Sequence, residues 1–202
     1  DLTTNARPGE VCRLFPDAGE VGAHFGVVLI RLPEGELQVA TYRSEDSYGD
    51  GRHPSQVRFE TDVRRDLERR DFTINALLED PFTGEVLDFS GGRQDLQAGL
   101  IRAIGDPRLR FTEDHLRMLR AVRFAARLGF RIETGTMAAI REQAPLIASI
   151  SAERVRDELT RILTEGAPRR GFELLDESGL LAVVLPEVKA MQGVAQPPEF
   201  HP

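Results

Sequence analysis

A stretch in the middle of the chain combines acidic and basic side chains at a spacing that suits nucleotide binding. One aspartate and three arginines recur every three residues, as Asp114, Arg117, Arg120 and Arg123. Residues three and four apart lie on the same side of an α-helix, so a helix would carry these charges along one slowly turning face, with Arg127 a turn further on. One carboxylate cannot neutralise four guanidinium groups, whereas a bound polyphosphate would.

The surrounding residues predict one helix that begins after Thr112 and ends at Gly129. Threonine is a suitable N-cap, the acids at 113 and 114 favour the positive end of a helix, and glycine commonly ends one. Like charges at these spacings destabilise a helix by about 0.2–0.5 kcal/mol per pair, so an unpaired arginine row carries a cost. The alternative to a nucleotide is that the arginines pair with acids from elsewhere in a chain of net charge −7.

Asp114 and Arg117 offer a hydrogen-bond acceptor and a planar set of donors side by side. A carboxylate accepts from the exocyclic amine of cytosine or adenine, and a guanidinium group donates to the ring acceptors of the same bases. Uracil and guanine do not fit this pattern equally well. The pair therefore predicts a protein template that selects C and A.

A second motif places Arg69 and Arg70 before Asp71 and an alternating apolar run that ends at Leu77. The alternation predicts a strand that enters the core. The simpler interpretation, a charged helix end followed by a buried strand, explains the apolar residues but gives no role to the basic pair.

A third motif opens the chain, where Asp1 precedes a short strand-like run and Pro8 marks a turn into a helix. Taken in order, the segments DLTTNARPGEV, RRDFTINAL and EDHLRMLRAVRF resemble the bacterial CCA-adding enzyme and poly(A) polymerase family of nucleotidyltransferases. The resemblance extends over nearly the whole chain.

This resemblance implies an α+β fold in two parts. Residues 1–106 would form a head with a DNA polymerase beta-like mixed sheet, and residues 107–202 an all-helical neck and body that bind nucleotide and RNA. The implied activity is template-independent addition of C and A from CTP and ATP to a tRNA 3′ end, with release of pyrophosphate. The implied partners are tRNA and these nucleotides, without DNA or a membrane.

Carried over motif by motif, the resemblance assigns Asp1 as a catalytic carboxylate and ligand of Mg²⁺. It makes Arg70 a nucleotide-binding residue, together with the residues of the charged helix, Asp114, Arg117, Arg120 and Arg123. The other carboxylate of the metal pair would precede Asp1, so the 202-residue chain by itself is expected to be inactive. Some relatives carry a third acid on a neighbouring strand, where this chain has Gln38.

The rest of the pattern predicts strands at 26–32 and 37–42, a mobile polar loop at 43–56, and a hairpin of 74–79 with 85–89. A short helix from Gly91-Gly92 and a strand at 100–104 follow, strands end near 106, and helices at 137–143, 151–165 and 168–179 complete the chain. In the helix at 151–165, Val155, Leu159, Ile162 and Leu163 are expected to face the core. No apolar run approaches the ~20 residues of a membrane helix, and the cytoplasm is expected.

Three alternatives remain open from the sequence. A tRNA nucleotidyltransferase and a poly(A) polymerase share the head motifs, and RNA choice would depend on the body. A nucleotide- or RNA-binding module without catalysis is the third, and the missing metal ligand separates it from the enzymes.

Overall fold

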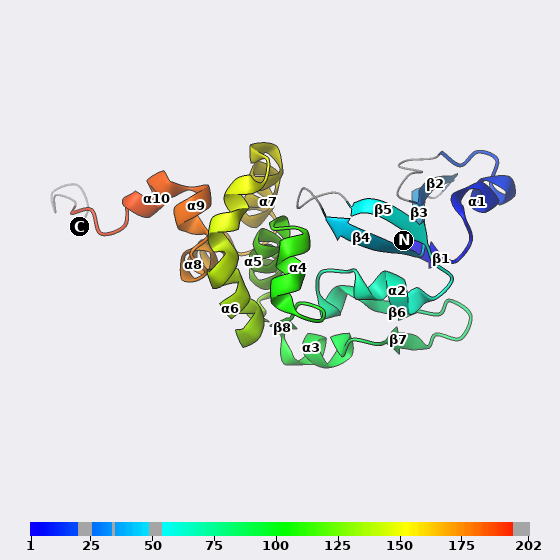
Figure 1. Cartoon of the computed structure of the whole chain (residues 1–202), viewed down its shortest axis with the longest axis horizontal. Helices are drawn as coiled ribbons and strands as arrows, with labels where there is room; N and C mark the ends of the chain where they lie inside the picture. Colours follow the sequence, from blue (N-terminus) through cyan, green and yellow to red (C-terminus); the bar gives the residue numbers. More distant parts are fainter. Residues whose placement is uncertain (20–25, 34, 49–53, 196–202) are drawn as a thin grey trace. The chain divides into compact units, whose positions relative to one another are not determined.

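The computed structural model describes residues 1–19, 26–33, 35–48 and 54–195, and it confirms a mixed α and β fold (Figure 1). The chain divides into two compact units, Asp1–Gly92 and Arg93–Pro202, called here the first and second unit. Strands dominate the first unit and helices the second.

The first unit is built on a three-stranded sheet with the order β1-β3-β2. Its strands are β1 (Leu2–Thr4), β2 (Val27–Leu32) and β3 (Gly35–Thr41), with β1 parallel and β2 antiparallel to β3. Helix α1 (Pro8–Leu14) adds Val11 to the core, where it packs with Val28, Ile30 and Val39. Alternate residues of β2 are thus buried, as period-two patterning requires, and the predicted hairpin at 26–42 is confirmed.

The prediction of a mobile loop at 43–56 is wrong for the residues of that segment that the structure describes. β4 (Arg43–Tyr48) and β5 (Pro54–Phe59) form an antiparallel hairpin whose register joins Arg43 to Phe59. Residues 49–53 lie outside the described residues. Polar side chains do not prevent a ladder, because its hydrogen bonds come from the backbone.

The prediction of a strand from Phe72 to Leu77 is also wrong, because the strand begins only at Leu77. After α2 (Val63–Glu68), residues Thr73–Asn75 form a turn of 3₁₀ helix, η2. Asp71 Oδ1 accepts hydrogen bonds from Phe72 N (2.9 Å) and Asn75 Nδ2 (3.0 Å), which favours a turn over extension. The hairpin that follows is confirmed but short, with β6 (Leu77–Glu79) antiparallel to β7 (Val86–Asp88).

Helices α3 to α10 account for most of the second unit. Their bounds are α3 (Gly92–Ala98), α4 (Pro107–Glu113), α5 (Leu116–Leu128), α6 (Thr134–Gln143), α7 (Ala152–Thr164), α8 (Pro168–Glu177), α9 (Leu181–Val184) and α10 (Pro186–Ala190), with a 3₁₀ helix η3 (Ala144–Ser149) after α6. Strand β8 (Leu100–Ile101) pairs in parallel with β9 (Arg131–Ile132), so one short strand follows residue 106, contrary to prediction.

Helix α5 is the centre of the second unit and packs against α7 and α8 (Figure 1). Met118, Leu119 and Val122 are fully buried. Gly129 ends α5 in the left-handed conformation, with φ 67°, as predicted. α8 approaches closely at Gly171, where a Cβ atom would lie 2.4 Å from Ile162 Cγ2 of α7.

Two predictions about these helices are corrected. The helix expected to begin after Thr112 is two helices, because Asp114 adopts an extended conformation (φ −150°, ψ 106°) between α4 and α5. On α7, Leu163 is 53% exposed rather than in the core, whereas Glu158 is buried. Among the described residues, no helix combines the length and apolar character needed to cross a bilayer.

Candidate functional site

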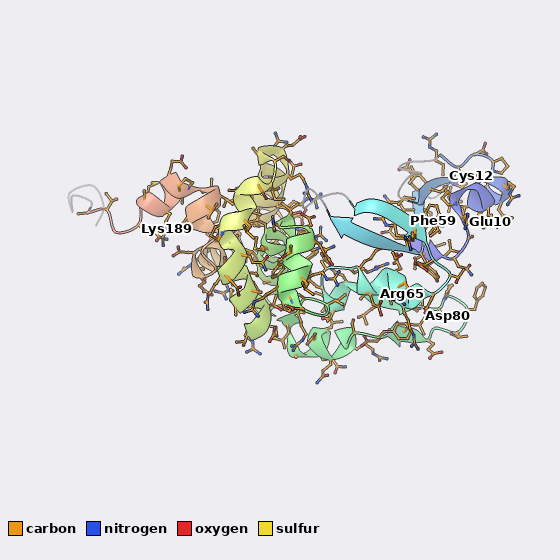
Figure 2. The ribbon with its side chains drawn as sticks, in the orientation of Figure 1. Glu10, Cys12, Phe59, Arg65, Asp80 and Lys189 are labelled. Atoms are coloured by element: carbon orange, nitrogen blue, oxygen red, sulfur yellow. The ribbon has the colours of Figure 1, made fainter. Side chains whose placement is uncertain are left out.

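Asp1 lies directly before β1, with its side chain exposed at one wall of a pocket of about 460 Å³ in the first unit. The opposite wall comes from the hairpin of β6 and β7, including Asp80, which Figure 2 labels in the turn of that hairpin. Asp80 is committed to the turn, because its Oδ1 accepts from Phe82 N and Thr83 N at 2.8 and 3.1 Å. The carboxylate of Asp1 is therefore open to a ligand from the pocket side.

The described residues do not assemble a complete metal site. No group of three or more His, Cys, Asp or Glu side chains in that part of the chain is arranged to hold a metal ion. Gln38, at the position considered for a further ligand, is exposed on β3 one residue before Val39, which pairs with Leu2. Asp1 thus directly precedes β1, which pairs with the strand that carries Gln38, and the described part of the chain supplies no set of partner ligands.

Arg70 is held by a carboxylate that the sequence analysis did not single out. Asp66 of α2 is 1% exposed, and its Oδ2 lies 3.1 Å from Arg70 Nη2. The other oxygen accepts from Arg69 Nη2 at 2.7 Å and from Arg43 N at 3.2 Å. Arg70 Nη1 also donates to Asn75 O at 3.0 Å, which ties α2 to η2. The i, i+3 and i, i+4 spacing of Asp66 to the two arginines was the available signal.

This buried carboxylate also affects a tyrosine. Burial, and secondarily the negative charge of Asp66, raise the pKa of Tyr42 above its ordinary value. Tyr42 lines the same pocket as Asp1. The Asp66 cluster, comprising Asp66, Arg69 and Arg70, thus sits next to the wall of the Asp1 pocket.

In the second unit, the joint between α4 and α5 fixes Asp114 from two sides. Its Oδ1 accepts a hydrogen bond from Leu116 N at 3.0 Å, and its Oδ2 accepts one from Arg154 Nη2 of α7 at 2.7 Å. Asp114 therefore caps the first turn of α5 while its carboxylate is held in one orientation. Arg154 was not predicted, and only the tertiary structure reveals this pair.

Arg117 is held close to the same joint. Its Nη1 donates to Glu113 Oε2 and to the Arg110 carbonyl, the latter at 3.1 Å. Glu113 also accepts from Arg110 Nη1 at 2.8 Å, so one carboxylate bridges two arginines. Asp114 and Arg117 thus flank the same joint, and each side chain has its own partner, Arg154 for Asp114 and Glu113 for Arg117.

The remaining arginines of the row have different surroundings. Arg123 is 4% exposed, and its Nε donates to Glu158 Oε2 of α7 at 2.7 Å in a buried ion pair. Arg120 is half-buried, and its guanidinium carbon lies 5.4 Å from the centre of the Phe124 ring. Arg127 pairs with Glu165 at 3.3 Å. Acids from elsewhere in the chain thus pair with Arg123 and Arg127, whereas Arg117 pairs with Glu113 of the same stretch.

The burial of Glu158 could have been predicted from its position in the sequence, although the apolar residues around it drew attention away from it. It lies three residues after Val155 and four before Ile162, so it occupies a core-facing position of α7. A carboxylate at such a position requires a buried partner, and Arg123 supplies it.

Comparison with known proteins gives two family matches. Residues 1–102 match the family described as the poly A polymerase head domain, and residues 129–192 match one described as a probable RNA and SrmB-binding site of polymerase A. A CCA-adding enzyme of Enterococcus faecalis is 44% identical over 171 residues, which is 85% of this chain and 42% of that protein.

Solved structures agree with these matches. The Bacillus stearothermophilus CCA-adding enzyme in complex with CTP has a TM-score of 0.84 at 36% identity, over 94% of this chain and 46% of that one. The Thermotoga maritima CCA-adding enzyme complexed with tRNA has a TM-score of 0.69 at 28% identity, over 89% and 40%. The chain spans less than half the length of these relatives.

Proposed function

The chain belongs to the poly(A) polymerase head-domain family, and from this we propose that its protein is a template-independent tRNA nucleotidyltransferase. It adds C and A from CTP and ATP to the tRNA 3′ end and releases pyrophosphate. The observation that carries the proposal is the match to a CTP-bound CCA-adding enzyme over 94% of the chain.

Base selection is assigned to Asp114 and Arg117. The carboxylate of Asp114 accepts a hydrogen bond from the exocyclic amine of cytosine or adenine, and the Arg117 guanidinium donates to a ring acceptor. The hydrogen bonds from Arg154 and Leu116 to Asp114 support this role, because an acceptor held in one orientation discriminates between bases better than a mobile one.

Arg70 of the first unit and Arg120 of the second unit are each kept as proposed nucleotide-binding residues. Arg123 was expected to share this task, but its buried ion pair with Glu158 supports a different one. We assign Arg123 to the packing of α5 against α7, which keeps the base-selecting residues in place. The hydrogen bonds of Arg70 to Asp66 and Asn75 hold it on the first unit.

Mg²⁺ is the proposed cofactor, and Asp1 is the proposed ligand within this chain. When bound, such an ion activates the RNA 3′-hydroxyl and stabilises the pyrophosphate leaving group. The described residues include no cluster of three or more potential ligands, so they do not by themselves form a site for the ion.

The functional division is proposed at residues 106 and 107, with a head before and a neck and body after. The match of the head-domain family to residues 1–102 supports it. Since tRNA, CTP and ATP are the proposed substrates, we also propose that the protein acts in the cytoplasm.

Primer extension tests the function, with protein expressed from its complete gene and with magnesium. The substrates are tRNAs that end at the discriminator base, at C or at CC, and an unstructured RNA, each offered CTP, ATP or both. Addition of C, C and A that then stops is the expected result. Long A tails on any RNA would indicate a poly(A) polymerase instead, and binding without addition would indicate the non-catalytic module.

A further inference from the structure

The second unit contains a basic pocket of about 300 Å³ that the proposed chemistry does not use. Three arginines from three different elements line it: Arg131 of β9, Arg141 of α6 and Arg170 of α8. Beneath them lie Ile132, Met137 and Leu174, of which Met137 and Leu174 are buried. The pocket therefore combines an apolar floor with positively charged walls.

The charges of the pocket are unbalanced. Glu177 is the one carboxylate among its lining residues, against three guanidinium groups. Its Oε1 accepts from Arg170 Nη1 at 2.9 Å, and its backbone carbonyl accepts from Arg141 Nε at 3.0 Å. Among the residues that the structure describes, the Arg131 side chain has no hydrogen bond or ion pair. Arg170 Nη1 also lies 3.5 Å from Glu173 Oε2, which does not line the pocket. Glu177 thus orients Arg170 through its carboxylate and Arg141 through its backbone carbonyl, and Arg131 has its donors available.

This arrangement suits an anion that carries both charge and an apolar part. Guanidinium groups bind phosphate oxygens in a planar, often bidentate geometry. Because Glu177 and its carbonyl already order two long side chains, less conformational entropy is lost when a ligand binds. An apolar floor of this size accommodates a ribose or an unstacked base beside a phosphate.

We propose that this basic pocket binds a backbone phosphate of the RNA substrate, with the adjoining nucleoside against its apolar floor. The proposal rests on the proposed function, since it presumes an RNA substrate. All lining residues fall between 131 and 177, within the segment that matches a probable RNA-binding family. The residues assigned to the incoming nucleotide, Asp114, Arg117 and Arg120, do not line it, which favours RNA over a nucleoside triphosphate.

The test measures binding of tRNA and of ATP to the chain and to Arg131→Gln across a series of salt concentrations. Arg131 is the cleanest site because its loss breaks no described ion pair. We expect tRNA affinity to fall about three- to tenfold, with the slope of log affinity against log salt reduced by about 0.7–0.9 for one phosphate contact. ATP affinity should not change.

Arg169→Gln is the matched control. It removes the same charge from the neighbouring position of α8, where the side chain is 93% exposed and does not line the pocket. Circular dichroism and thermal unfolding of both variants verify that each is folded. A short polyglutamate peptide serves as an acidic competitor without phosphate.

Each outcome decides the proposal. A loss confined to Arg131→Gln and to tRNA supports it, and it would stand even if primer extension detected no nucleotide addition. Four results would each overturn the proposal. They are an equal loss of tRNA affinity in Arg169→Gln, a parallel loss of ATP affinity in Arg131→Gln, displacement of tRNA by polyglutamate, and no tRNA binding by the unaltered chain.

Discussion

Arg154 Nη2 lies 2.7 Å from Asp114 Oδ2, and this contact joins two residues that are 40 positions apart in the sequence. Both side chains are largely shielded, at 22% and 17% exposure. Arg154 therefore acts as a positioning residue, because it fixes the acceptor that we assign to base selection. Under the proposed assignment of Asp114, this hydrogen bond connects α7 to nucleotide choice.

The first prediction is that Arg154→Met relaxes base selection. Methionine keeps much of the apolar stem but removes the donor, so the Asp114 carboxylate gains freedom. The ratio of CTP to UTP incorporation should fall by about fivefold, or about 1 kcal/mol, which is the size of a typical intramolecular hydrogen bond. Single-turnover incorporation with each nucleotide measures this ratio.

Arg156→Met is the control for that experiment, because Arg156 is 68% exposed on the same helix and pairs only with its neighbour Asp157 among the ion pairs described. Its incorporation ratio should match the unaltered protein. An unchanged ratio in Arg154→Met, with both proteins folded, would contradict a positioning role for Arg154.

The second prediction concerns the stability of the buried pair between Arg123 and Glu158. Arg123→Ala leaves Glu158 buried without its closest partner and should lower the free energy of unfolding by about 3–5 kcal/mol. Arg127→Ala, which removes a more exposed ion pair to Glu165, should cost about 0–1 kcal/mol. Chemical denaturation of both variants measures the difference.

A double variant separates the pair from simple loss of packing. Replacing both Arg123 and Glu158 with methionine removes both charges together, and it should recover most of the stability lost in Arg123→Ala. If Arg123→Ala proves as stable as Arg127→Ala, the assignment of Arg123 to the packing of α5 against α7 is wrong.

The third prediction is a pH dependence at the start of α6. Burial raises the pKa of Glu133, but hydrogen bonds from Gly135 N, Thr136 N and Thr136 Oγ1, together with Arg102, outweigh it, so the pKa lies below the ordinary 4.5. A lowered pKa stabilises the fold above pH 4.5, and this contribution disappears as the pH falls through the folded-state value.

Glu133→Ala should therefore lower the free energy of unfolding by about 1 kcal/mol at pH 7, the scale of an N-cap. The difference in the free energy of unfolding between Glu133→Ala and the unaltered chain should become smaller below pH 4.5. Glu142→Ala, at an exposed position of the same helix, is the control. If this difference in the free energy of unfolding stays constant down to pH 3, the charge of Glu133 does not contribute to stability.

The fourth prediction concerns Tyr42 and Asp66. In a Tyr48→Phe background Tyr42 is the only tyrosine, so its ionisation can be followed by ultraviolet absorbance. Asp66→Asn removes a negative charge and should lower the Tyr42 pKa, which stays above 10.0 because burial is the larger cause. The raised pKa stabilises the fold below pH 10.0, and that contribution is lost as the pH rises through the folded value.

Glu68→Gln is the control, since Glu68 lies on the same helix with its side chain 66% exposed. It should leave the titration unchanged. If Asp66→Asn moves the Tyr42 pKa upward or not at all in a folded protein, the charge of Asp66 does not act on that hydroxyl.

Local sequence signals predicted much of the fold. Gly129 ended α5, Pro168 began α8, and the apolar residues of 26–32 and 37–42 predicted the central hairpin. In each case the deciding interaction lies within a few residues of the signal. Such elements can be predicted from the chain itself.

The errors arose where distant residues decide the structure. Thr112 was predicted to cap the helix, whereas the chain breaks at Asp114, which bonds to the distant Arg154. The pairing of β8 with β9 joins Leu100 to Arg131, which no local pattern reveals. For the same reason, the sequence did not predict that Arg123 is buried against Glu158 of α7.

The break between α4 and α5 limits how this chain can change during evolution. Asp114 bonds the first backbone N–H of α5 through Oδ1 and Arg154 through Oδ2, so substitutions there alter the helix start together with the proposed base recognition. Under that proposal, we expect a new nucleotide preference to arise more readily through Arg117 or its partner Glu113. Asp114 should therefore remain fixed in lineages whose specificity drifts.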